Sequence, residues 1–379
     1  MKPRLSFYTN IPTPYQLDFC QALAERFELN VVFYAQTEKG RQWKFKTNLD
    51  LYNVIVLRNS WIADWFQMRV KDFHFSWQLF SIVRNDRSDY IIVGGAYWIP
   101  NSLIVMIYAW LLGKPVAFFG ERISSRATGW RKIMKLLALQ PLHICCRRIF
   151  AIGQEAAQTY QAFGVQLPIT NIPYNLDGKK FRAVTSRLLR ILQSQYRCDD
   201  TLIFLSSGAL IHRKGMDTLV RAFRLLDTEQ YPNVRLLILG EGPQRSELER
   251  YTEKDSRIEL LGFRQAEELP AYFNLADVFI FASRYDGWGV VINEAIAASL
   301  PIICTETVGA AQEWIINGVN GILCPPNHEL ALYDAMKRLI HSAEIRRKMG
   351  SYNAALALKT DSRSYANLLF DVVSEDLTI

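Results

Sequence analysis

Residues 278–304 read VFIFASRYDGWGVVINEAIAASLPIIC, and this stretch decides the fold class. The apolar run at 278–281 is typical of a buried strand, the pattern over 290–298 of a helix, and the run at 301–304 of a second strand. Two strands joined by a helix predict a parallel sheet, because parallel strands need a long crossover connection. The glycine-rich turn before the helix would then lie at the carboxyl edge of that sheet, where ligands bind in open α/β sheets.

The same alternation of strand and helix patterns runs through almost the whole chain, which predicts parallel sheets covered by helices. In the first half we expect strands at 5–8, 31–34, 54–57, 91–93, 116–119 and 148–152, and helices at 15–26, 102–112 and 130–139. In the second half we expect further strands at 202–205, 234–239 and 258–260, and helices at 216–226, 244–252, 267–275 and 330–340. The predicted fold class is therefore α/β.

The length of 379 residues, half of them hydrophobic, predicts two domains, because it exceeds what one ordinary core accommodates. The segment 172–177 contains Pro and Asn and is the predicted crossing point between the domains. We expect an N-terminal Rossmann-like domain over 1–175 and a C-terminal one over 176–355. Two such sheets facing each other would place a cleft at their carboxyl edges.

The cysteine pattern and the hydropathy bear on the cellular compartment. The six cysteines form no CxxC pair and, with five scattered histidines, give no zinc-binding spacing, so we expect buried thiols in a reducing cytosol. No signal peptide is recognisable at the N-terminus. The most apolar stretch, 102–112, is shorter than the roughly 20 residues that cross a bilayer. The sequence predicts a cytoplasmic protein.

The net charge of +7 arises in the first half of the chain. Residues 1–175 contain 20 Lys and Arg against 11 Asp and Glu, and 113–148 contain eight basic residues with Glu121 as the single acid. A surface of that sign attracts phosphate, anionic lipid or nucleic acid. We recognise no nucleic-acid-binding motif in this half, so a nucleic-acid partner is not expected.

Gly208, Arg213 and Lys214 follow the strand predicted at 202–205, in the segment SSGALIHRKG. A glycine lets a ligand approach the backbone, an Arg guanidinium presents a planar fork to phosphate oxygens, and a Lys ammonium is a compact charge. A diphosphate leaving group needs such neutralisation, because charge develops on it as the bond to it breaks. A solvated pair of cations ahead of a helix explains the same residues equally well.

Asp286 and Glu294 stand eight positions apart, the first in a turn with Gly287 and Gly289 and the second about one turn into the next helix. Such a pair can face one ligand from one side, and the N–H groups at the helix start favour a phosphate. Glu294 suits the two vicinal hydroxyls of a ribose, and Asp286 suits the hydroxyls of a second sugar. The alternatives are a turn-capping Asp and an exposed helical Glu.

Together these segments resemble the retaining glycosyltransferases of family 4, the group 1 transferases of the GT-B fold. The resemblance covers about 202–324. It rests on the order and spacing of GALIHRKGMDTLVRAF, LILGEGP, LLGF, ADVFIFAS, the two acids and NGVNGIL. Asp286 stands where the family usually has Glu, and Trp288 where Phe is usual. The resemblance implies two Rossmann-like domains facing each other across a cleft, with a last helix over 356–379 packing back toward the N-terminal domain.

By position, the resemblance assigns the donor diphosphate to Arg213 and Lys214, the donor sugar to Asp286 and the ribose to Glu294. The remaining residues of the implied donor site are Gly208, Gly262, Phe263, Gly287, Trp288, Gly289 and Val290. The implied reaction moves a sugar, with retention, from a nucleotide-diphospho-sugar such as a UDP-sugar. It uses no metal and no bound cofactor, and it depends on positioning and charge stabilisation. The alternatives are a sugar-nucleotide epimerase or hydrolase of the same fold and a nucleic-acid-binding protein.

Three residues of the first half are candidates for contact with the acceptor. Tyr97 and Trp98 follow a predicted buried strand and a Gly-Gly pair, and their rings could stack on a sugar. Glu121 follows the next strand and could orient an acceptor hydroxyl. The alternatives are aromatic residues of the core and a salt bridge from Glu121 to Arg122 or Arg126.

Two segments of the first half predict contact with an anionic membrane surface. The helix at 130–139 is basic and amphipathic, and residues 41–46 mix cations with aromatic side chains. With this contact we expect a glycan or lipid-linked acceptor and a role in the synthesis of a cell-envelope polysaccharide or glycolipid. An ordinary helix with a solvated face is the alternative.

Overall fold

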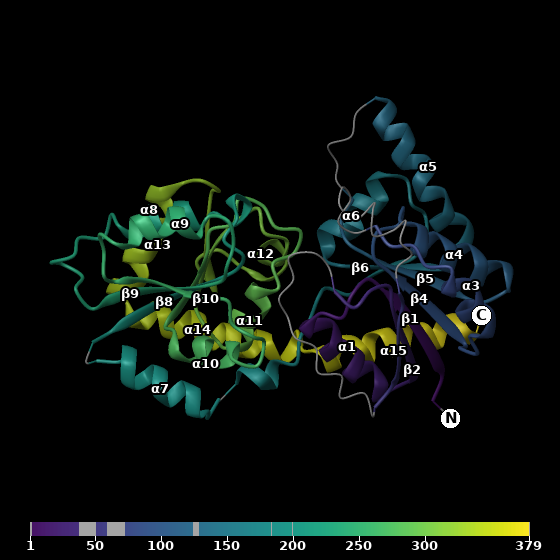
Figure 1. Ribbon diagram of the computed structural model, residues 1–379, viewed down its shortest axis with the longest axis horizontal. Helices are drawn as coiled ribbons and strands as arrows, with labels where there is room; N and C mark the ends of the chain where they lie inside the picture. The colour runs from purple at the N-terminus through teal and green to yellow at the C-terminus, as the bar shows by residue number, and fades with distance from the viewer. Residues whose placement is uncertain are drawn as a thin grey trace. The chain divides into compact units, whose positions relative to one another are not determined.

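The computed structural model describes residues 2–37, 51–58, 73–123, 129–182, 184–198 and 200–378. The chain forms two compact units (Figure 1). The N-terminal unit contains Met1–Asn175 together with Ser362–Ile379, and the C-terminal unit contains Leu176–Asp361. Each unit has a parallel sheet and its own hydrophobic core, so the predicted α/β fold class is confirmed.

The N-terminal unit is built on a seven-stranded sheet with the order β3-β2-β1-β4-β5-β6-β7. The strands are β1 (Arg4–Thr9), β2 (Glu28–Phe33), β3 (Asn53–Val56), β4 (Tyr90–Gly94), β5 (Val116–Gly120), β6 (Arg148–Ala151) and β7 (Ile169–Asn171). Every pairing is parallel, as between Leu5 and Tyr90 of β1 and β4. The central strands β4 and β5 are buried along their whole length, as expected for strands covered on both faces.

The helices described in the N-terminal unit are α1 (Pro14–Ala24), α3 (Gln78–Asn85), α4 (Pro100–Leu111), α5 (Trp130–Cys145), α6 (Gln154–Ala162) and α15 (Ser362–Thr378). Proline occupies the first position of α1 and α4, where the missing N–H has no partner to lose. The core of this unit gathers residues of the sheet, α4, α5 and α6.

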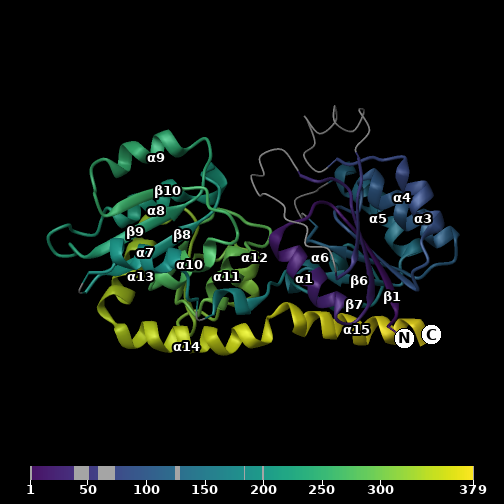
Figure 2. The ribbon, with the colours of Figure 1, turned by 60° about the horizontal axis from the view of Figure 1, so that its bottom comes forward.

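The last helix, α15, packs against α1 (Figure 2). Asp376 anchors it to the sheet by accepting hydrogen bonds from Tyr90 Oη at 2.6 Å and from the Arg148 guanidinium at 2.8 and 3.0 Å. Burial alone would raise the pKa of Asp376, but the hydrogen bonds from Arg148 and Tyr90 outweigh it and lower that pKa. The final residues of the chain therefore complete the unit that its first residues begin.

The C-terminal unit repeats this topology in a six-stranded sheet with the order β10-β9-β8-β11-β12-β13. The strands are β8 (Leu202–Ser207), β9 (Val234–Leu239), β10 (Ile258–Gly262), β11 (Val278–Phe281), β12 (Ile302–Thr305) and β13 (Gly321–Cys324). The helices are α7 (Arg187–Tyr196), α8 (Met216–Phe223), α9 (Arg245–Thr252), α10 (Leu269–Leu275), α11 (Val291–Ala297), α12 (Gly309–Trp314), α13 (Glu329–His341) and α14 (Ala343–Lys359), with single 3-10 turns η1 (Gly178–Phe181) and η2 (His212–Lys214).

Several elements differ from the sequence prediction. It did not predict the short elements α3, α6, β7, α12 and β13, and it gave no bounds for α7 and α14. Strand β7, for example, has three half-buried residues, which leave no hydrophobic run to recognise. Helix α5 extends to Cys145 instead of ending at 139, although Pro141 lies inside it. The buried side chains of Leu139, Leu142 and Cys145 hold this last part of α5 on the core and offset the lost backbone hydrogen bond.

Two further expectations concern thiols and membranes. All six cysteines are free, and five of them are buried; Cys198 is exposed, contrary to the expectation of buried thiols. In the parts of the chain that the structure describes, no helix is long and apolar enough to cross a membrane. The basic and aromatic segment 41–46 lies outside the described residues.

Candidate functional site

The strand order of the C-terminal unit defines one position at which a ligand is expected. Strands β8 and β11 are neighbours in the sheet. The chain continues from β8 to β9 on one side of this pair and from β11 to β12 on the other side. At such a switch point the loops that follow the two strands diverge and leave room for a ligand at the carboxyl edge. The loops in question are residues 208–215 after β8 and 282–290 after β11, which contain most of the predicted donor-site residues.

The two predicted cations, Arg213 and Lys214, meet one carboxylate at this edge. Lys214 Nζ donates a hydrogen bond to Asp286 Oδ2 and lies 4.8 Å from the centre of the Phe281 ring. Arg213 Nη1 is 3.3 Å from the same oxygen and donates to the Tyr285 carbonyl at 2.8 Å. The Lys214 side chain is 14% exposed and the Arg213 side chain 45% exposed. Both cations therefore contact the same carboxylate oxygen, and the Arg213 side chain remains partly open to solvent.

Close backbone contact holds the two loops together. Gly215 has φ +65°, and a Cβ atom there would lie 2.1 Å from the Ala282 carbonyl oxygen. Gly208 lies beside the cation, since a Cβ atom on it would be 3.7 Å from Lys214 Cδ. Ser283 Oγ donates to the Arg213 carbonyl at 3.1 Å, which adds a direct hydrogen bond between the loops. The position of the cations is thus fixed by the backbone around them.

A second ion pair, between Arg284 and Asp217, ties the loop after β11 to the start of α8. Arg284 Nη1 and Nη2 donate to the two Asp217 carboxylate oxygens at 2.8 and 2.7 Å, and the Arg284 amide donates to the Arg213 carbonyl at 2.9 Å. Burial alone would raise the pKa of Asp217, but hydrogen bonding and charge from Arg284, with Arg221, lower it to about 2. This pair lies in sequence beside both Arg213 and Asp286, and the sequence analysis did not identify it.

Asp286 and Glu294, the predicted acid pair, have different surroundings. Asp286 is 8% exposed, and besides the two cations its Oδ1 accepts a hydrogen bond from the Trp288 amide at 3.4 Å. Glu294 lies in the first turn of α11 and is half-buried. The structure therefore brings Asp286 into direct contact with Arg213 and Lys214, whereas the resemblance assigns the carboxylate and the two cations to different parts of the donor.

The side chain of Trp288, a predicted donor-site residue, is buried. Its side chain is 4% exposed, donates from Nε1 to Asn293 Oδ1 at 2.9 Å and packs edge-to-face on Trp314. An indole in this position is part of the interior, so only the backbone of Trp288 can line a donor site. Its neighbour Gly289 has φ +86°, and a Cβ atom there would lie 2.7 Å from Val308 Cγ1, which explains the glycine.

Gly262 is the last residue of β10 and Phe263 follows it, and β10 lies on the outer side of β9. The Gly262 carbonyl accepts a hydrogen bond from the Gly240 amide at 2.9 Å, and a Cβ atom on Gly240 would lie 1.9 Å from the Gly208 carbonyl oxygen. The loops after β8, β9 and β10 are therefore in contact with one another. This close contact explains why a glycine, Gly240, stands in the turn after β9.

The acceptor candidates lie at the carboxyl edge of the N-terminal sheet. Tyr97 is half-buried and packs against the core, while Trp98 is 43% exposed. Glu121 is exposed and accepts a hydrogen bond from Tyr174 Oη at 2.8 Å. Of the two predicted alternative partners of Glu121, Arg122 forms an ion pair with Glu155, and Arg126 lies outside the described residues.

The switch point of the N-terminal sheet lies between β1 and β4, and the sequence analysis assigned no ligand contact to the loop after β1. In this loop Asn10 Oδ1 and Thr13 Oγ1 are buried without a hydrogen-bond partner among the described residues. Asn10 Oδ1 covers Gly95, since a Cβ atom there would lie 2.4 Å from it. Buried polar atoms without partners are uncommon because they cost free energy.

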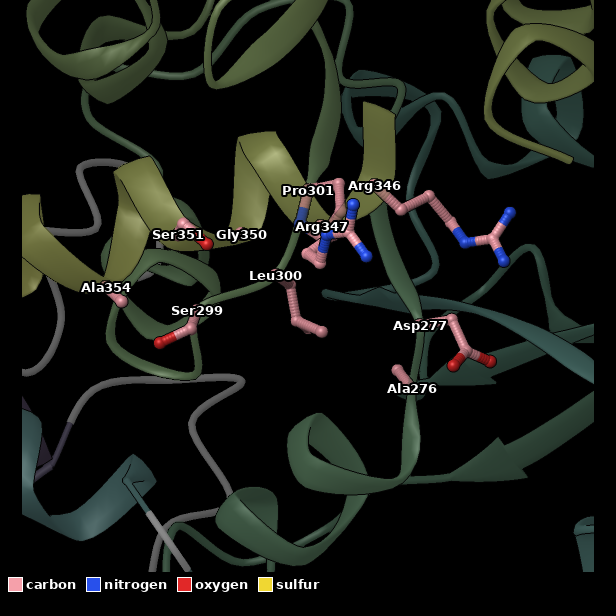
Figure 3. A pocket seen from close by; sticks show the side chains of 10 residues that line it. All are labelled: Ala276, Asp277, Ser299, Leu300, Pro301, Arg346, Arg347, Gly350, Ser351 and Ala354. Carbon is pink, nitrogen blue, oxygen red and sulfur yellow. The ribbon is translucent and has the colours of Figure 1, made fainter. Parts of the chain in front are cut away.

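A pocket of about 430 Å³ lies elsewhere on the C-terminal unit (Figure 3). Its walls include Asp277 and Pro301, which directly precede β11 and β12, and Arg346 and Arg347 of α14. It is therefore at the amino edge of the sheet, opposite the loops that contain Lys214 and Asp286. We do not assign the candidate site to it, because ligands of such sheets bind at the carboxyl edge.

Within the described ranges, no group of three or more His, Cys, Asp or Glu side chains is placed to hold a metal ion. Metal-independent transfer and the absence of a cofactor stay predictions.

Comparison with known proteins gives a consistent result. Residues 191–355 match the family model described as glycosyl transferases group 1. The chain is 29% identical over 178 residues to alpha-D-kanosaminyltransferase of Streptomyces kanamyceticus, an alignment that covers 46% of each chain. It is 32% identical over 198 residues to alpha-monoglucosyldiacylglycerol synthase of Acholeplasma laidlawii, covering 50% of this chain and 48% of that protein. The chain thus matches about half the length of these relatives.

Among solved structures, the crystal structure of Anabaena Alr3699/HepE in complex with UDP superposes with a TM-score of 0.79. The superposition covers 98% of this chain and 100% of that chain, at 18% sequence identity. The likeness extends over both units and establishes the fold. Residues 191–355 thus match the glycosyl transferases group 1, and the fold of the chain is GT-B.

Proposed function

We propose that this protein is a retaining glycosyltransferase that moves a sugar from a nucleotide-diphospho-sugar, with a UDP-sugar as the expected donor, to a glycan or lipid-linked acceptor. The observation that carries the proposal is the pairing of Arg213 and Lys214 with the carboxylate of Asp286 at the switch point of the C-terminal sheet. The ammonium of Lys214 and the exposed guanidinium of Arg213 suit the diphosphate of such a donor.

The chemistry of the donor explains why two cations are needed. When the bond between the sugar and the diphosphate breaks, negative charge grows on the leaving oxygen, and nearby cations lower the barrier by stabilising it. Lys214 is mostly buried and held by Asp286, so its ammonium group is fixed before the donor arrives. Little reorganisation is then needed during the reaction, which makes the stabilisation more effective.

The remaining donor contacts follow the same arrangement. Glu294, half-buried in the first turn of α11, would accept hydrogen bonds from the ribose hydroxyls. The backbone of Gly208 and of residues 287–290 would line the phosphates and the sugar, with Gly262 and Phe263 toward the base. Asp286 then has two roles: it holds Arg213 and Lys214 in place, and it offers a carboxylate oxygen to the donor sugar.

The proposed transfer retains the configuration of the sugar and uses neither a metal nor a bound cofactor. The sequence offers no residue that we would assign as a covalent nucleophile, so the acceptor would attack from the face that the diphosphate leaves. The departing phosphate would help to remove the acceptor proton. Catalysis would then depend on positioning the two substrates and on charge stabilisation.

The proposed acceptor contacts lie in the N-terminal unit, at Tyr97, Trp98 and Glu121. Trp98 is exposed enough to stack on a sugar ring, and Glu121 presents a carboxylate to solvent. The lipid in the name of the relative alpha-monoglucosyldiacylglycerol synthase favours a glycolipid as the product, with an envelope polysaccharide as the alternative. We propose a cytoplasmic enzyme that works at the membrane surface.

Thermal unfolding in the presence of UDP, GDP and ADP tests the donor assignment. We expect UDP to raise the melting temperature, because a ligand that binds only the native state stabilises it. Arg213→Ala should abolish this shift. The control is Lys348→Ala, which removes an ion-paired lysine of α14 outside the site and should leave the shift unchanged.

Two outcomes would contradict the proposed function. If no nucleotide shifts the melting temperature, the donor site is wrong. If UDP-sugar is consumed without any acceptor, the protein is the hydrolase or epimerase alternative.

A further inference from the structure

Helix α5 exposes an apolar stripe. Its large exposed side chains are Trp130, Ile133, Met134, Leu137 and Ile144, with exposed fractions of 69%, 60%, 55%, 58% and 58%. Spacings of three, four and seven residues place these side chains on one face of the helix. A surface helix of a water-soluble unit normally exposes polar residues there, so this face requires an explanation.

The apolar surface continues on the two helices next to α5. Helix α4 contacts both α3 and α5, and the three lie together in Figures 1 and 2. The exposed large hydrophobic side chains here are Trp77 and Phe80 at α3, and Ile107, Trp110, Leu111 and Leu112 at α4. With those of α5 they make up eleven of the 24 such side chains in the described parts of the chain. We refer to these eleven residues as the α3–α5 surface.

Charge distinguishes between the possible occupants of this surface. The sequences of α3, α4 and α5 contain Arg84, Arg131, Lys132 and Lys135 and no Asp or Glu. A symmetric dimer through this face would bring like charges together, because both copies present the same patch. An anionic bilayer complements both properties, since it accepts apolar side chains and attracts Lys and Arg.

The composition of the α3–α5 surface also fits the boundary of a bilayer. Trp77, Trp110 and Trp130 are exposed by 66%, 44% and 69%, and Trp is enriched where apolar and aqueous phases meet. Helices α4 and α5 have 12 and 16 residues, too few to span the hydrocarbon region. They are therefore suited to lie on the membrane and not to cross it.

We propose that the α3–α5 surface docks the protein on an anionic lipid bilayer, with the exposed stripe of α5 inserted among the headgroups. This proposal deepens the proposed function, on which its purpose rests: docking would bring the enzyme to a lipid-linked acceptor. The binding itself can be measured without donor or acceptor. A failure of docking and a failure of sugar transfer are therefore separate results.

Vesicle flotation of the full chain tests the proposal. We expect the protein to float with vesicles of phosphatidylcholine and phosphatidylglycerol at low salt, and less with phosphatidylcholine alone or at high salt. Combining Trp130→Ser, Ile133→Ser and Leu137→Ser should lower the partition coefficient roughly tenfold or more, since apolar insertion and charge act together. These side chains are exposed, so the variant should keep the wild-type melting temperature and circular dichroism spectrum.

The matched control combines Ile191→Ser, Leu225→Ser and Leu358→Ser, three exposed apolar residues of the C-terminal unit with exposed fractions of 50%, 45% and 62%. The control should float like the wild type. Absence of flotation, or an equal loss in both variants, would overturn the proposal. It would also be overturned if the wild type is a dimer that the α5 substitutions convert to a monomer, because a second copy would then be the occupant.

Discussion

In both units the first strand lies beside the fourth strand along the chain, yet the loops at this point differ in their chemistry. In the C-terminal unit, the loops after β8 and β11 are joined by Lys214–Asp286 and by Arg284–Asp217, two ion pairs that are largely shielded from solvent. In the N-terminal unit, the loops after β1 and β4 meet through Asn10 and Gly95 and carry aromatic side chains. The same strand order thus places ion pairs at the carboxyl edge of one sheet and aromatic side chains at the carboxyl edge of the other.

This difference indicates how the two units divide the proposed reaction. An edge with two fixed cations, Arg213 and Lys214, suits a donor diphosphate, which has the same chemistry in every donor of the class. An edge with exposed aromatic side chains suits a sugar, which is bound by stacking and by hydroxyl contacts. The assignment of the donor to the C-terminal unit also agrees with the family match, which lies at 191–355. The fold is common to both units, and the chemistry is set by the loops.

The largest effect is expected from Lys214→Ala in the charged edge. This change removes the buried cation and leaves the carboxylate of Asp286 with Arg213 as its remaining ion-pair partner among the described residues. We expect kcat for sugar transfer to fall by about 10²–10³-fold, the usual effect of removing one charge-stabilising group. The measurement is the transfer of a labelled sugar from UDP-sugar. Lys348→Ala is the control, and equal rates in the two variants would remove Lys214 from the mechanism.

The next effect concerns the N-terminal unit and its last helix. Asp376→Ala leaves the mostly buried guanidinium of Arg148 without its carboxylate, and such a loss typically costs about 3 kcal/mol. We expect the free energy of unfolding of the N-terminal unit to fall by this amount, as measured by urea unfolding. UDP binding to the C-terminal unit should persist. If the variant loses UDP binding as well as stability, the two units do not unfold independently.

A smaller effect should appear in the pH dependence of the C-terminal unit. The pKa of Asp217 in the folded state is about 2, below its usual value, so its ion pair stabilises the fold above about pH 4 and is lost as the pH falls toward 2. The contribution is about 2 kcal/mol. Asp217→Asn should remove it, and the difference in unfolding free energy between wild type and variant should shrink across this window. A difference that stays constant from pH 5 to about pH 2 would contradict the assigned pKa.

The comparison also shows which features the sequence could predict. The strands β9 and β11 were predicted with their observed bounds, because each is a continuous apolar run between turn residues. The neighbourhood of Lys214 and Asp286 was predictable as well, since parallel strands bring their carboxyl ends to one edge of the sheet. Local sequence patterns were therefore sufficient for features that depend on the burial of a strand or on the direction of the chain.

Other features depend on contacts that no local pattern encodes. The pair Arg284–Asp217 joins residues 67 positions apart, and neither residue is unusual in its own segment. Trp288 follows a glycine in a turn, a position that suggests exposure, yet its indole is buried against Trp314. The sequence predicted a basic, amphipathic helix at 130–139, but not the exposed apolar side chains of α3 and α4 beside it. In each case tertiary packing decided which side of the segment faces solvent.

The smallest effect should come from the aromatic edge, through Trp98→Ala. The Trp98 ring is 43% exposed, so its loss should change the free energy of unfolding by no more than about 0.5 kcal/mol. If the ring stacks on the acceptor, the KM for the acceptor should rise about tenfold, whereas the Kd of UDP should not change. Tyr352→Ala, an aromatic residue of α14 with 40% exposure, is the matched control. A change in UDP affinity without a change in acceptor KM would assign Trp98 to the donor, and the proposed division between the two edges would then be wrong.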